Sequence, residues 1–160
     1  MSSNTKILLI MIVAVLSVAL LIGGGAWYWW SRNSAEFLDA GIVASTEGQN
    51  SGRSLNEGGC MAAAFERHKA EGSQRIGAAV RNSVWLTSCL ESSKVKDKFC
   101  DGVPAADNLI GVGTWAGASC VRQGFADPYC GTLFGIVPKY CASAQRAQKL
   151  KAGGVSHPGG

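Results

Sequence analysis

An uncharged segment from Ile7 to Trp30 constrains this chain more than any other feature of its sequence. It begins ILLIMIVAVLSVALLI, continues through Gly23-Gly24-Gly25-Ala26 and ends in four aromatic residues. As a helix rising 1.5 Å per residue it would extend roughly 36 Å, enough to cross a hydrocarbon core of ~30 Å. We therefore predict a transmembrane helix over residues 7–30. The residues expected at the two membrane interfaces are Lys6, Trp27, Tyr28, Trp29 and Trp30.

A cleaved signal peptide is the alternative interpretation of the same segment. Gly24 and Ala26 are small enough to stand three residues and one residue before a cleavage site. The apolar run is longer than a usual signal core, however, and the segment before it carries a single lysine, Lys6. These features favour an uncleaved anchor.

The six cysteines decide which way such an anchor points. All of them follow the apolar segment, and an even number in a small domain is typical of a disulfide framework formed in an oxidising compartment. They are Cys60, Cys89, Cys100, Cys120, Cys130 and Cys141. We therefore expect residues 1–6 in the cytoplasm and the rest of the chain outside. Since no Asn-x-Ser/Thr acceptor follows the span, we expect a bacterial inner membrane with the domain in the periplasm.

Residues 31–59 are rich in Gly, Ser, Asn and Glu, and this composition predicts a flexible tether. One short apolar stretch, from Phe37 to Val43, interrupts it. An alternative is that this stretch forms a short element that docks on a partner.

Residues 60–150 carry helical patterns. A helix-forming stretch starts at Met61, and apolar residues recur at three and four positions from Ile76 to Thr87, after Ser73 as a candidate N-cap. Pro104 and Pro138 each stand where the first residue of a helix is expected. The predicted fold is therefore all-α: one N-terminal transmembrane helix followed by a small, disulfide-stapled, helical exported domain. Residues 151–160 are predicted to be a disordered basic and Gly-containing tail.

Disulfide pairing is open, because six cysteines allow fifteen arrangements. Two pairs of cysteines flank short polar connections between predicted helices, Cys89 with Cys100 and Cys120 with Cys130. Joining each pair leaves Cys60 to bond Cys141. A set shifted by one cysteine, with Cys130 bonded to Cys141, is the alternative.

No motif in the chain fixes a chemistry. Cys-x-x-Cys, Gly-x-Ser-x-Gly and His-Glu-x-x-His are all absent from the sequence. His68, between Arg67 and Lys69, is expected to be an exposed helix residue. The segment LIGVGTWAG, from Leu109 to Gly117, only loosely resembles a dinucleotide-binding turn, and its glycines are expected to let a second helix approach closely. No metal or cofactor is predicted.

Acidic side chains are the remaining candidates for catalysis. Two of them placed about 5 to 9.5 Å apart would suit hydrolysis of a cell-wall glycan. The candidates are Glu66, Glu71, Asp97, Asp101, Asp107 and Asp127. The sequence does not show which of them meet, so we expect solvated charges and a protein that is not an enzyme.

Basic residues gather after Asp127, beyond which the chain has no acidic residue. They include Lys139, Arg146, Lys149 and Lys151. Such an end favours an anionic envelope surface, although cations also suit a helix C-terminus. Nucleic acid is not an expected partner.

These observations favour a non-enzymatic, single-pass accessory or interaction subunit of a membrane protein complex. Its partners would be other transmembrane subunits and the lipid bilayer. The alternatives are a periplasmic binding module for an envelope polymer or small ligand, and a cell-wall-active hydrolase.

Overall fold

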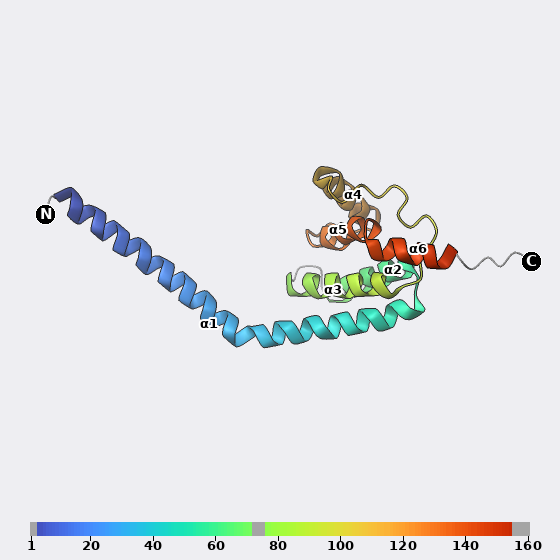
Figure 1. The fold of residues 1–160 in the computed structure, drawn as a ribbon, viewed down its shortest axis with the longest axis horizontal. Coiled ribbons are helices and arrows are strands. Elements are labelled where there is room, and N and C mark those ends of the chain that lie inside the picture. The colour runs from blue at the N-terminus through green and yellow to red at the C-terminus, as the bar shows by residue number, and fades with distance from the viewer. Residues whose placement is uncertain (1–2, 72–75, 155–160) are drawn as a thin grey trace, which may run out of the picture. The chain divides into compact units, whose positions relative to one another are not determined.

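The computed structural model describes residues 3–71 and 76–154 and confirms an all-α protein (Figure 1). Its helices are α1 (Ser3–Ser54), α2 (Glu57–Ala70), α3 (Ile76–Ser92), α4 (Leu109–Arg122), α5 (Cys130–Cys141) and α6 (Ala144–Gly154). The chain divides into two compact units, residues 1–39 and residues 40–160. Each unit is described by itself.

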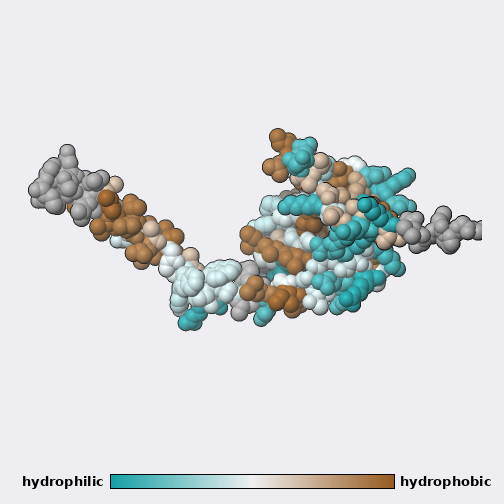
Figure 2. Space-filling view, viewed as in Figure 1, coloured by the Kyte–Doolittle hydropathy of each residue, from teal (hydrophilic) through white to brown (hydrophobic). Residues whose placement is uncertain are grey.

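The first unit holds the apolar part of α1. Residues Ile10–Arg32 form a helix long and apolar enough to cross a membrane, with none of its length buried inside the protein. Much of the described surface of this part of α1 is hydrophobic (Figure 2). Together with the disulfides of the second unit, an N-terminal hydrophobic helix, as a signal or an anchor, indicates export.

The second unit is a helical domain around one core. The core joins side chains of every helix from α1 to α5. Its largest fully buried apolar side chains include Leu86, Leu90 and Leu133. The aromatic rings of Phe65 and Phe134 pack with their centroids 4.9 Å apart.

The predicted tether is the main difference from the sequence analysis. Its residues are helical to Ser54, and the part within the second unit, residues 40–54, packs against α3. A Cβ atom on Gly48 would collide with the Trp85 carbonyl oxygen, and one on Gly52 would collide with the Cys89 carbonyl oxygen. Glycine and serine are weak helix formers alone, but here they let two helix backbones approach closely. Tertiary packing therefore overrides composition in residues 40–54.

The ends of the helices follow local capping signals. Asn56 caps α2 by accepting a hydrogen bond from the Gly59 N–H at 2.9 Å, and Asn108 caps α4 in the same way through Gly111. The helix predicted after Pro104 therefore begins later, at Leu109. The predicted N-cap Ser73 lies outside the described residues.

Two other boundaries also differ from prediction. Pro138 lies inside α5 instead of starting a helix, and the following helix begins at Ala144. The predicted tail from residue 151 is helical to Gly154, and residues 155–160 lie outside the described residues. Pro138 has no N–H to donate to the carbonyl group of Phe134, four residues earlier, so it removes one possible intrahelical bond near the end of α5.

Candidate functional site

The four aromatic residues predicted at the membrane interface lie near the C-terminal end of the apolar span. The exposed fractions of Trp27 and Tyr28 are 75% and 61%, and those of Trp29 and Trp30 are 55% and 54%. Lys6 belongs to α1, but its side chain lies outside the described residues. A lipid headgroup layer suits these aromatic side chains better than water does.

All six cysteines are paired, and one of the three predicted bonds is correct. Cys120 bonds Cys130, which ties the end of α4 to the start of α5. The other predicted pairs are wrong, because Cys60 bonds Cys89 and Cys100 bonds Cys141. Cys60 lies near the start of α2 and Cys89 near the end of α3. Because these consecutive helices form an antiparallel hairpin, the two cysteines face each other.

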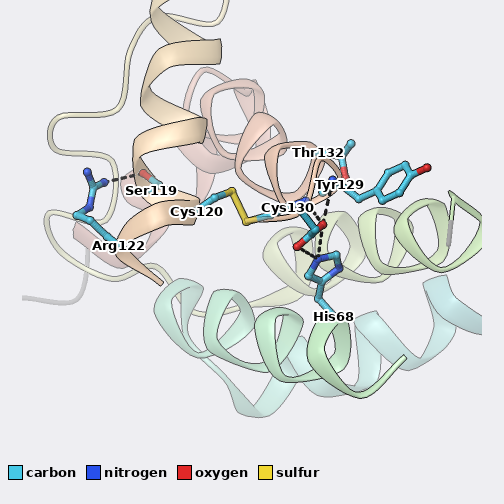
Figure 3. The surroundings of a disulfide bond; sticks show 8 residues. His68, Ser119, Cys120, Arg122, Tyr129, Cys130 and Thr132 are labelled. Atoms are coloured by element: carbon cyan, nitrogen blue, oxygen red, sulfur yellow. Dashed lines mark hydrogen bonds and ion pairs between the residues drawn. A yellow bond between two sulfur atoms is a disulfide. The ribbon is translucent and has the colours of Figure 1, made fainter. Parts of the chain in front are cut away.

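The prediction for His68 is also wrong. Its side chain is 2% exposed, and its Nε2 lies 3.1 Å from both carboxylate oxygens of Asp127 (Figure 3). The ring packs edge-on against Phe125. Because α2 turns one face toward the 125–128 segment, a position flanked by two cationic residues in sequence is buried in space.

Asp127 holds this corner of the domain together. Its Oδ1 accepts the backbone N–H groups of Tyr129 and Cys130, each at 3.0 Å. Burial acts to raise the pKa of Asp127, but the hydrogen bond and positive charge of His68 and the two N–H groups outweigh it, so the pKa lies below its usual value of 3.8. The ionised carboxylate thus fixes the start of α5 beside the Cys120–Cys130 bond.

The other acidic candidates serve elsewhere. Glu66 pairs with Lys69 on the surface of α2, and Glu71 pairs with Arg81 of α3. Asp97, Asp101 and Asp107 are exposed in the connection between α3 and α4. In the described residues, no group of three His, Cys, Asp or Glu side chains is arranged to hold a metal ion.

The basic C-terminal end is less basic at the surface than its sequence predicts. Arg146 turns inward and donates from Nε to Glu57 Oε1 at 2.7 Å. Lys149 donates to the carbonyl oxygens of Leu90 and Ser93, at the end of α3, and burial lowers its pKa. Of the four cations named in the sequence analysis, Lys139 and Lys151 remain exposed.

A groove with a mainly apolar lining lies between α4 and α5. It has a volume of about 390 Å³ and ends at Asp127. The glycines that line it are Gly113, Gly117, Gly131 and Gly135. A Cβ atom on any of the four would meet nothing within 4 Å. The expected close approach of another helix at Gly113 and Gly117 is therefore not made by any described part of the chain.

Helix α4 is unusual beside this groove, since it carries no charge from Leu109 to Val121. Uncharged helical segments of about this length are generally buried in a core. In α4, however, only Ala116, Ser119 and Cys120 are buried. Leu109, Ile110 and Val121 are 80%, 84% and 73% exposed. This helix presents apolar surface for which the described chain provides no cover.

Two further packing features of the domain were not predicted from the sequence. The first is the packing of Gly48 and Gly52 on α3, and the four-residue spacing Ala44-x-x-x-Gly48-x-x-x-Gly52 is the signal that could have found it. The second is the buried pair of Glu57 and Arg146, for which the sequence carries no local signal.

No known protein family, curated protein or solved structure matches this chain in sequence or fold. Its function is therefore inferred from its own geometry and chemistry.

Proposed function

We propose that this protein is a non-enzymatic, single-pass accessory subunit of a membrane protein complex in the bacterial inner membrane. In this proposal α1 is an uncleaved anchor with a cytoplasmic N-terminus, and the disulfide-bonded domain lies in the periplasm. The domain docks a partner subunit along the groove between α4 and α5. The observation that carries the proposal is the uncovered apolar face of α4.

The glycines of the groove support a docking role. A glycine inside a helix costs about 0.5–1 kcal/mol relative to alanine. Gly48 and Gly52 offset that cost by admitting α3, but Gly113 and Gly117 admit no described part of this chain. Residues that weaken a helix and that no packing within the chain explains are expected at functional surfaces. Here they leave a smooth path for a helix of another subunit.

The span supports a location beside other membrane subunits. The most apolar part of its helix Ile10–Arg32 has a mean hydropathy of 2.3, and none of that part is buried inside the described protein. Four consecutive aromatic residues, Trp27 to Trp30, lie near its end, as they do where a helix leaves the hydrocarbon layer. An anchored domain would also meet its partner at high effective concentration, so a shallow groove would suffice.

A periplasmic binding module is the second candidate, because the groove volume of about 390 Å³ falls in the range that small ligands occupy. A hydrolase has less support. Among the acidic candidates, Asp127 is the one that contacts a histidine, His68, and the side chains of His68 and Asp127 are only 2% and 6% exposed. Substrate would not reach either of them without a rearrangement of the domain.

Purification of the tagged full chain from membranes in mild detergent, followed by quantitative mass spectrometry, tests the proposal. We expect a membrane protein to co-purify with the wild type and its recovery to fall by about tenfold, ~1.4 kcal/mol, for Gly117→Leu. Ala118→Leu is the matched control, since Ala118 is the exposed neighbour on α4 that does not line the groove. Equal recovery with Gly117→Leu and wild type would contradict docking in the groove. A small molecule or glycan retained by the isolated domain would favour the binding module.

A further inference from the structure

The helices α1 and α3 run parallel in the domain, so both begin at the same end of it. Gly48 lies against Trp85, and Gly52, one turn later, lies against Cys89. Four residues forward on α1 thus correspond to four residues forward on α3. Extending this register backwards places the first domain residues of α1 beside the first residues of α3 (Figure 1).

That end of the domain carries four exposed branched apolar side chains, which we call the end patch. They are Ile42 (63% exposed), Val43 (55%), Ile76 (71%) and Val80 (51%). Hydrophobic surface is visible near the beginning of α3 in Figure 2. The neighbouring Ala44, Ala78 and Ala79 are buried, so the patch is the outer face of helices whose inner faces form the domain.

The length of chain between the span and the end patch determines which surfaces the end patch can contact. Ile42 follows Arg32, the last residue of the span, by ten residues. Ten residues cover roughly 15 Å as a helix and about 35 Å when fully extended. The headgroup layer on one side of a bilayer is only about 5–8 Å thick. If α1 is an anchor, the bilayer is therefore the nearest environment in which the end patch can bury its apolar side chains.

We propose that the end patch inserts at the boundary between headgroups and acyl chains of the bilayer that holds α1. This inference rests on the anchor of the proposed function and goes beyond it, since it gives the domain a lipid-facing end distinct from the groove. Two isoleucines and two valines give weak binding alone, because interfacial affinity scales with the apolar area buried. Tethering supplies the effective concentration that makes such a weak contact persist. The four side chains are uncharged, so the contact is insensitive to salt.

Fluorescence of the full chain in lipid nanodiscs tests the inference. A nitrobenzoxadiazole probe is attached to Ile76→Cys under non-reducing conditions that preserve the disulfides, and the nanodiscs contain lipids with a nitroxide on the headgroup. The matched control is Gln148→Cys, an exposed position of α6. The adjacent Lys149 of α6 bonds carbonyls at the opposite end of α3. We expect a blue-shifted probe at position 76, quenched several-fold more strongly than the probe at position 148, at both low and high salt.

Further variants separate the outcomes. Val43→Asn with Val80→Asn should reduce quenching at position 76, and both residues are exposed, so the fold is retained. Equal quenching at positions 76 and 148 would overturn the inference. A probe that responds only when a partner protein is added would also overturn it and assign the patch to a protein interface. The intact mass of the native protein reports separately whether the anchor is cleaved. Co-purification of a partner through the groove is an independent measurement. Failure of the lipid contact and failure of the proposed function are therefore distinguishable.

Discussion

Glu57 and Arg146, 89 residues apart in sequence, form an ion pair inside the domain with Nε and Oε1 2.7 Å apart. The other carboxylate oxygen of Glu57 accepts the Lys96 N–H at 2.8 Å. The pair joins the start of α2, the connection after α3, and α6. Glu57 is fully buried, and burial of the neighbouring Tyr140 hydroxyl, together with the charge of Glu57, raises the pKa of that hydroxyl. This pair connects the ends of the domain where the sequence analysis expected a disulfide.

Removing one member of this pair should destabilise the domain strongly. For Glu57→Gln in residues 40–160 we expect a loss of about 3–5 kcal/mol, because Arg146 is left buried without its counter-charge. The midpoint of denaturant unfolding measures the loss. Replacing both residues by methionine should recover most of the stability. The control Glu66→Gln removes an exposed pair and should cost no more than about 1 kcal/mol. A similar loss of stability for Glu57→Gln and Glu66→Gln would contradict the structural role of Glu57.

Two glycine substitutions should have opposite effects. Gly48→Ala places a methyl group against the Trp85 carbonyl oxygen and should cost about 1–3 kcal/mol. Gly113→Ala meets nothing within 4 Å and should stabilise the domain by about 0.5–1 kcal/mol through the better helix propensity of alanine. Thermal unfolding of residues 40–160 measures both changes. A neutral Gly48→Ala would indicate that residues 40–54 do not pack on α3.

The pKa of Asp127 predicts a pH dependence. Because that pKa is lowered in the folded protein, the carboxylate stabilises the domain fully above its usual value of 3.8, and the contribution is lost as pH falls through the folded value. Asp127→Asn should therefore cost about 2–3 kcal/mol at neutral pH, since it removes hydrogen bonds to a charged group. The difference from wild type should shrink below pH 3.8. Unfolding of both proteins between neutral and strongly acidic pH measures this, and the exposed Asp101→Asn should show no such trend.

The disulfide pairing makes a covalent prediction. Peptide mapping without reduction should find Cys120 with Cys130, closing a short loop, and two bonds that close loops of 29 and 41 residues. The longer bonds are Cys60 with Cys89 and Cys100 with Cys141. A fragment that links Cys60 to Cys141 would contradict this arrangement.

The structural features that were correctly predicted from the sequence depend on local patterns. The apolar run at Ile7 and the helical period from Ile76 to Thr87 are local, so the hydrophobic helix and α3 were both predictable. Cys120 and Cys130 flank one short connection, so their bond was also within reach. Each of these features depends on residues of one continuous stretch of sequence.

The structural features that were not predicted depend on contacts with residues far away in the sequence. Residues 40–54 have the composition of a linker, and only the approach of α3 explains their helix. His68 has charged neighbours in sequence, but its partner is 59 residues away at Asp127. The groove of α4 was equally hidden, because a glycine that admits another helix and one that leaves open space have the same sequence signature.

The intact mass of the protein extracted from membranes, measured without reduction, tests the account most directly. An uncleaved anchor joined to an oxidised domain predicts a chain that retains α1 and is six hydrogens lighter than its fully reduced form, two for each of the three disulfides. A chain that begins at Trp27 would show that the hydrophobic helix is a cleaved signal and would contradict the anchored subunit. A chain with six free thiols would contradict export itself.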